Sequence, residues 1–80
     1  MRFLDKTPAE MLEFAGSKPA RAAQQFLANR YPTVAWTATS FIGTPPEVAS
    51  ATYLDDGGNT LVLLFQQRGI AWLISEKAPD

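Results

Sequence analysis

The chain has 80 residues, no cysteine, no histidine and a formal net charge of −1. Its 46% hydrophobic and 19% charged residues exclude a disordered chain, and its length fits a single domain over residues 1–80 with a small core. Without histidine or cysteine it lacks the usual general base, thiolate nucleophile and soft metal ligands, so we expect no enzyme, no catalytic residue, no cofactor and no metal.

Location and membrane contact are expectations from the same composition. The sequence has no run of about 18 apolar residues, as a transmembrane helix requires. Residues 1–6 do not contain the apolar segment of a secretory signal, and no cysteine framework points to an oxidising compartment. We therefore expect a cytoplasmic protein that makes no membrane contact.

Two helix signals come first along the chain. Thr7-Pro8-Ala9-Glu10 has the form of a capping box, which predicts a helix that ends near Ala15, with Gly16 in a left-handed conformation. Ser17 is a second N-cap, and the helix-forming residues after it run to Arg30. On a helical wheel this second helix has one apolar side. That side is formed by Ala20, Ala23, Phe26, Leu27 and Tyr31.

Strand patterns follow the helices. Alternation predicts a half-buried strand over Thr33–Ile42, in which Val34, Trp36 and Ala38 share one side. Small residues over Val48–Leu54 indicate a second strand. The strongest turn signal is the stretch 55–59, Asp-Asp-Gly-Gly-Asn, in which we expect residues 56–58 to form the tight part.

The stretch Thr60–Ser75 predicts a hairpin, because two strand-forming apolar runs surround a polar break at Gln66–Gly69. Antiparallel pairing across this break sets apolar residues opposite one another on both faces. The expected pairs are Phe65 with Ile70, Leu63 with Trp72, Leu61 with Ile74, Leu64 with Ala71, and Val62 with Leu73.

Together these elements predict an α+β domain with two N-terminal helices packed on one face of a four-stranded antiparallel meander sheet. The element order resembles that of cystatin-like folds and, more loosely, that of small two-layer inhibitor domains. This resemblance rests on element order, so it implies a fold and no function.

If Leu54 and Thr60 flank the turn, the two sheet faces differ. The bulkier face, which the helices' Phe26, Leu27 and Met11 should cover, contains Ala49, Ala51, Tyr53, Leu61, Leu63, Phe65, Ile70, Trp72 and Ile74. The opposite face contains Ser50, Thr52, Leu54, Val62, Leu64, Ala71, Leu73 and Ser75. Its centre is apolar, and the chain has no third layer for it. We therefore predict a protein interface at Leu54, Val62, Leu64 and Leu73.

The sequence thus favours a non-enzymatic protein-binding module, a small adaptor, inhibitor or regulatory subunit, whose partner is another protein or a second copy of this chain. One alternative is a small-molecule binder with a pocket between helices and sheet, around Trp36, Trp72 and Tyr53. A second alternative is a weak nucleic-acid-binding domain that uses a basic patch on the second helix, formed by Lys18, Arg21 and Gln25. Because the chain is slightly acidic, we rank nucleic-acid binding last of the three functions.

Overall fold

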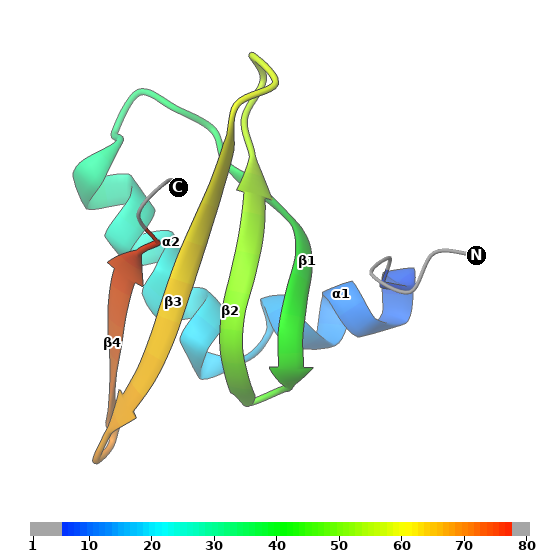
Figure 1. Ribbon diagram of the computed structural model, residues 1–80, viewed down its shortest axis with the longest axis vertical. Coiled ribbons are helices and arrows are strands. Elements are labelled where there is room, and N and C mark those ends of the chain that lie inside the picture. The colour runs from blue at the N-terminus through cyan, green and yellow to red at the C-terminus, as the bar shows by residue number, and fades with distance from the viewer. Residues whose placement is uncertain (1–5, 78–80) are drawn as a thin grey trace.

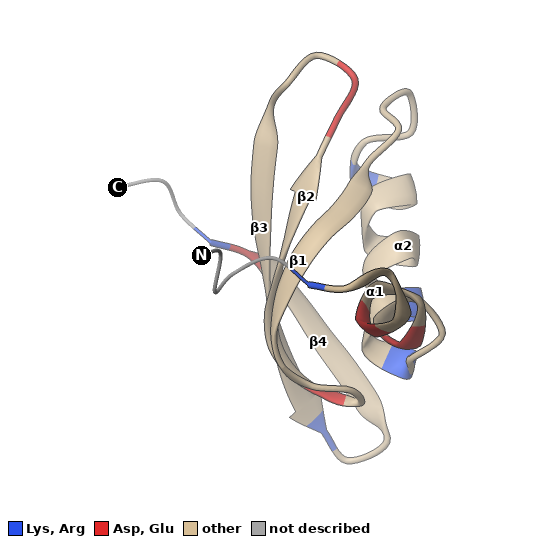
Figure 2. Cartoon of the chain, turned by 90° about the vertical axis from the view of Figure 1, so that its right-hand side faces the viewer, with Lys and Arg blue, Asp and Glu red and all other residues tan. Residues whose placement is uncertain are grey.

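The computed structural model describes residues 6–77. The elements are α1 (Pro8–Ala15), α2 (Lys18–Arg30), β1 (Thr37–Thr44), β2 (Glu47–Leu54), β3 (Thr60–Arg68) and β4 (Ala71–Glu76). The strands form one antiparallel sheet in the order β1-β2-β3-β4. Both helices lie on one side of it (Figure 1, Figure 2). The predicted α+β fold, two helices on one face of a four-stranded antiparallel meander, is confirmed.

Both helices begin as their caps predict. The Glu10 backbone N–H donates to Thr7 Oγ1 (3.2 Å) and the Thr7 N–H to Glu10 Oε1 (2.9 Å), which completes the capping box. Ser17 Oγ accepts from the Ala20 N–H at the start of α2 (3.4 Å). The prediction that Gly16 has a left-handed conformation is wrong, because its φ is −85°. Ser17 follows directly as the next cap, so the chain enters α2 through a right-handed turn.

β1 begins later than the expected Thr33–Ile42 and ends two residues beyond it. A turn at residues 32–33, closed by a hydrogen bond from the Val34 N–H to the Tyr31 carbonyl (3.1 Å), keeps the first part out of the sheet. Val34 is therefore exposed, although the alternation grouped it with Trp36 and Ala38. The last two partly cover the core, as expected.

A bulge in β1 reverses the side on which its residues lie. Ala38 pairs with Tyr53 and Ser40 with Thr52, so Thr39 is an extra residue. After the bulge Phe41 points into the core. Without the bulge, alternation from Ala38 would place Ser40 and Ile42 there instead.

A second register shift lies in β2. Ile42 pairs with Ser50 and Gly43 with Val48, which leaves Ala49 without a partner. Val48 is buried in the core as a result, and Ala49 is exposed. The assignment of Ala49 to the inner face is therefore wrong.

The β2–β3 hairpin has the predicted register, with Leu54 paired to Thr60 and Ala51 to Leu63. In its turn Asn59 donates from its side chain to Asp55 Oδ2 (3.0 Å) and from its backbone to Asp55 Oδ1 (2.8 Å). These bonds hold the pKa of the Asp55 carboxyl below its usual value. Asp55 is thus a turn residue, and the positive φ of the turn (+83°) belongs to Gly58.

The predicted β3–β4 register is wrong by four residues. Phe65 pairs with Ile74, and β3 continues through the polar residues to Arg68, which pairs with Ala71. The turn is the two-residue Gly69-Ile70, with φ of +63° at the glycine, typical of a type II′ hairpin. Ile70, expected to face Phe65, is consequently 96% exposed. Because the shift is even, the other residues of the hairpin keep their expected faces.

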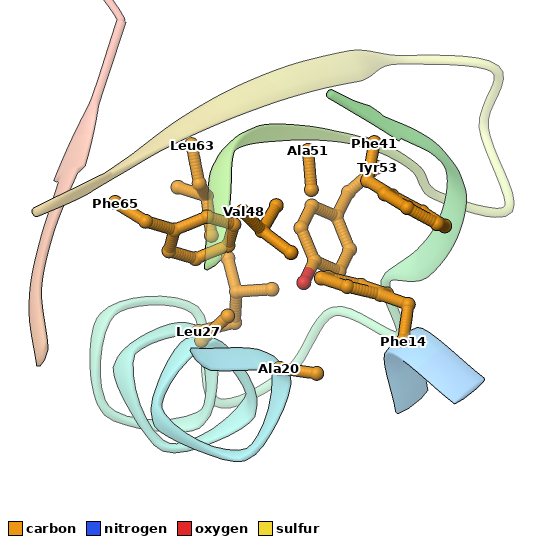
Figure 3. Packing of buried hydrophobic residues seen from close by; sticks show 10 residues of the cluster. Phe14, Ala20, Leu27, Phe41, Val48, Ala51, Tyr53, Leu63 and Phe65 are labelled. Atoms are coloured by element: carbon orange, nitrogen blue, oxygen red, sulfur yellow. The ribbon is translucent and has the colours of Figure 1, made fainter. Parts of the chain in front are cut away.

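The core lies between the helices and the inner face of the sheet (Figure 3). Leu27 is buried there, and Phe26 and Met11 pack at its margin, as predicted. Three core residues were not predicted, Phe14 of α1, Phe41 of β1 and Val48 of β2. The buried cluster consists of Phe14, Ala20, Ala23, Leu27, Phe41, Val48, Ala51, Tyr53, Leu63 and Phe65.

Candidate interaction face

The sheet face opposite the helices, here called the outer face, is not covered by any element within the described residues 6–77. Figure 2 shows α1 and α2 on the same side of the strands. The core residues all point to that side, which leaves the alternate residues of each strand on the outer face. The absence of a third layer, expected from the sequence, is thus found in this part of the chain.

The predicted interface residues lie on this outer face. Leu54 and Leu64 are exposed, Val62 is half-buried, and Leu73 is 52% exposed. Val62 and Leu64 are successive outward residues of β3. Leu54 and Leu73 lie diagonally from them on the neighbouring strands, because Val62 pairs with Thr52 and Leu64 with Ser75. The structure therefore gathers the four side chains into one apolar stripe across β2, β3 and β4.

Ile42 extends this stripe to β1 and was not predicted. It is 64% exposed, more than any of the four predicted residues. Its partner Ser50 also pairs with Leu64, so the three residues form one row across the sheet. A sequence signal existed, because Phe41 is out of phase with Trp36 and Ala38, and a large aromatic residue out of phase indicates a bulge.

The centre of the outer face is uncharged. Hydroxyl groups surround the aliphatic side chains, and the charged residues lie toward the margins, with Glu47 at the start of β2 and Arg68 at the end of β3. Lys6 borders a hollow beside β1 that is also lined by Ser40, Ile42, Ser50 and Thr52. The hydroxyl-bearing residues are Thr37, Ser40, Ser50, Thr52, Thr60 and Ser75. An apolar centre depleted of charge, with a polar rim, is the composition of the core of a protein–protein interface.

The helices fix the sheet from its other side. Glu76, the last residue of β4, contacts the Arg30 guanidinium at the end of α2 and accepts a hydrogen bond from the Tyr31 hydroxyl (2.8 Å). A hydrogen bond that the Arg30 guanidinium donates to the Tyr31 hydroxyl oxygen, together with the nearby charge of Glu76, raises the pKa of Arg30. These contacts attach the edge strand β4 to α2, so this edge of the sheet is held in position by the second helix.

The core contains a buried tyrosine hydroxyl, that of Tyr53. Tyr53 is 1% exposed, and its hydroxyl has no hydrogen-bond partner within the described residues. Burial raises the pKa of Tyr53 to about 12, because the phenolate would lose its hydration. In Figure 3 this hydroxyl points toward the helices, away from the outer face, and so it takes no part in the candidate interface.

The three aromatic residues of the alternative pocket do not line one cavity. Tyr53 is in the core, Trp72 packs edge-on against Phe65 (6.5 Å between ring centroids), and Trp36 packs edge-on against Tyr31 (5.6 Å). Trp36 does border a groove of about 520 Å³. The groove lies between α1, α2 and β1 and is lined by Pro8, Met11, Leu12, Ala15, Gln24, Trp36, Thr37 and Ala38.

The residues of the predicted basic patch share one side of α2. Lys18, Arg21 and Gln25 are all exposed, at helical spacings of three and four residues. Two cations are few for a nucleic-acid surface. Of the aromatic residues considered for base stacking, Tyr53 is buried in the core.

Residues 6–77 also bear on other classes of site. Over this range no helix has the length and apolar character needed to cross a membrane. The same residues contain no group of three or more acidic, histidine or cysteine side chains that could hold a metal ion.

Comparison with known proteins yields no relative. No family model matches the chain, and no curated protein and no solved structure is significantly similar to it.

Proposed function

We propose that this protein is a non-enzymatic protein-binding module, an adaptor, inhibitor or regulatory subunit, that binds through its outer sheet face. The observation that supports this most directly is the stripe of exposed aliphatic side chains on a sheet face that no element of residues 6–77 covers. The stripe consists of Ile42, Leu54, Val62, Leu64 and Leu73. Contiguous exposed apolar patches on soluble domains commonly mark interaction sites. For its location we keep the expectation from the sequence, the cytoplasm.

Small-molecule binding ranks second. The groove beside Trp36 supports it, because its walls are largely apolar and Leu12 in it is 76% exposed. However, the indole Nε1 of Trp36 is itself buried and has no partner within the described residues, so this donor is shielded from the groove. Gln24 is then the polar side chain left in the groove to orient a ligand, because the Thr37 side chain lies on the outer face. Nucleic-acid binding through Lys18 and Arg21 ranks third.

The proposal is tested by placing charges of opposite sign on the stripe, as Leu54→Lys with Leu64→Glu. Both side chains point outward, so the variant should fold, as circular dichroism and thermal unfolding would show. Binding to partners captured by the immobilised wild-type protein, and any self-association, should be lost, because each charge would have to be desolvated at the interface. Leu73 is left unchanged because it borders the free edge of β4.

The control is Leu12→Glu, which places a charge on an exposed leucine on the helix side of the molecule. Its partners should be those of the wild type. If the double variant does not fold, Leu54 and Leu64 belong to the intramolecular core. A folded double variant that captures the same partners would show that binding occurs elsewhere. Either result contradicts the proposed function.

A further inference from the structure

The two free edges of the sheet differ in their protection against pairing with another strand. β1 has the extra residue Thr39, which interrupts its ladder, and Pro45 and Pro46 follow it. Bulges and prolines are devices that block strand addition at an edge. β4 pairs with β3 without a register shift and contains no proline, lysine or arginine. β4 is therefore the edge that can accept a further strand.

The ladder between β3 and β4 shows which backbone groups are free. The Lys77 N–H donates to the Val62 carbonyl (2.9 Å), and bonded pairs alternate along β4 from that point. By this alternation Leu73 and Ser75 exchange hydrogen bonds with β3. The backbone N–H and C=O groups that point to the open edge, without a backbone partner in residues 6–77, are those of Trp72, Ile74 and Glu76.

We propose that β4 pairs antiparallel with β4 of a second copy of this chain, around a two-fold axis at Ile74. Ile74 then faces Ile74 of the second copy, and Trp72 faces Glu76 of the second copy. In an antiparallel ladder each such pair exchanges both of its backbone hydrogen bonds. One sheet would run through both copies, with their helices on the same side. The pairing uses backbone groups of the edge, so it does not depend on the outer face being an interface.

The charges and the free backbone groups of β4 favour a two-fold axis at Ile74 over the other registers. Around Ile74 the whole strand overlaps, Glu76 faces Trp72, and Lys77 faces Ala71, so no like charges are opposed. An axis at Glu76 would set two carboxylates opposite each other, which is unfavourable. An axis at Leu73 would pair only Trp72 with Ile74 and leave Glu76 opposite the turn residue Ile70. An axis at Ser75 would pair only Ile74 with Glu76 within residues 6–77, and one at Trp72 would pair only part of the strand. The axis at Ile74 is the one that uses the free groups of Trp72, Ile74 and Glu76 together. A strand that is complementary to itself favours a second copy as its partner.

The first half of the free edge of β4 is open. In Figure 1, β4 forms one margin of the sheet, and no strand or helix lies beside the first half of its free edge. α2 reaches the strand at its other end, where Arg30 and Tyr31 contact Glu76. On the outer face Leu73 would lie opposite Ser75 of the second copy, so the apolar stripes of the two copies would become one surface.

Cysteine crosslinking tests the geometry directly, since the chain has no cysteine of its own. Ile74→Cys lies at the proposed axis, where facing Cα atoms are about 5.5 Å apart, within disulfide range. We expect most of the folded Ile74→Cys protein to form a disulfide-linked dimer on mild oxidation. Leu12→Cys on the helix side and Leu64→Cys on the outer face should stay largely monomeric under the same conditions.

A second pair of variants tests the backbone itself by analytical ultracentrifugation. Ile74→Pro removes an N–H that points to the open edge and leaves the ladder with β3 intact, so it should shift the dimer to monomer. Ile74→Ala loses a comparable amount of side chain but keeps the N–H, and it should remain dimeric. If the proline variant does not fold, the crosslinking result stands on its own.

A wild-type protein that sediments as a monomer at every concentration would overturn the inference, as would Ile74→Cys crosslinking no faster than Leu12→Cys. Fast crosslinking of Leu64→Cys alone would also overturn it, and would show copies that meet through their outer faces, as the proposed function allows. If Ile74→Cys crosslinks and the folded Leu54→Lys, Leu64→Glu protein still captures the wild-type partners, pairing through β4 is supported and the proposed function is contradicted.

Discussion

The rings of Phe14 and Phe41 stack in the core, with centroids 4.9 Å apart and planes inclined by 14°. Phe14 is the one buried residue of α1, and Phe41 lies just after the bulge at Thr39 in β1. This contact joins the first helix to the outermost strand, and so it holds α1 on the sheet. The Lys6 ammonium lies 4.6 Å from the centroid of the Phe41 ring and adds a cation–π contact.

The first prediction concerns this aromatic pair. Phe14→Leu should lower the free energy of unfolding by about 0.5–1.5 kcal/mol, because the apolar volume is largely kept and the ring contact is lost. In a double-mutant cycle with Phe41→Leu, urea unfolding should give a coupling energy of about the same size. Leu12→Ala on the exposed side of α1 is the control and should change stability by less than about 0.5 kcal/mol. Additive effects of the two leucine substitutions would show that the rings do not stack.

The second prediction concerns the buried hydroxyl of Tyr53. Because it has no partner, Tyr53→Phe should leave the free energy of unfolding at pH 8 unchanged or raise it by up to about 1 kcal/mol. A clear loss of stability at this pH would show that the hydroxyl does have a partner.

The same variant should change the dependence of stability on pH. The pKa of Tyr53 rises from 10.0 to about 12 on folding, so between these values the unfolded chain binds fewer protons than the folded one. The free energy of unfolding should therefore fall as the pH rises from 10 toward 12, and fall less in Tyr53→Phe. Urea unfolding at pH 8 and pH 11 measures the difference. If the free energy of unfolding falls equally in both proteins, the Tyr53 ring is exposed to water.

The third prediction concerns the turn between β2 and β3. Gly58 has a φ of +83°, and a Cβ there would meet no atom within 4 Å, so Gly58→Ala reports backbone strain alone. It should destabilise the protein by about 1–2 kcal/mol. Gly57 has no positive φ, and a Cβ there would be 3.3 Å from the Asn59 side-chain amide, which can move. Gly57→Ala should accordingly cost less than Gly58→Ala in thermal unfolding. The opposite order would mean that the turn has another conformation.

The sequence alone determined the features that depend on neighbouring residues. The capping box at Thr7 and Glu10, the cap at Ser17 and the turn after Leu54 are local arrangements of a few side chains with the nearby backbone. Period-two alternation in β2 and β3 then assigned Tyr53 and Leu63 to the core and Leu64 to the outer face, because a strand's side chains alternate whatever its partner is.

Only the tertiary structure decided the register of β4 and the bulges of the first hairpin. An even shift of β4 leaves Trp72 and Leu73 on the same faces, so the hydrophobic pattern cannot choose between registers, and the two-residue turn at Gly69 does. The bulge at Thr39 brings Phe41 onto Phe14, a residue distant in sequence, and in doing so it turns Ile42 outward. The extent of the apolar stripe on the outer face therefore follows from how the core packs, which alternation along a single strand does not encode.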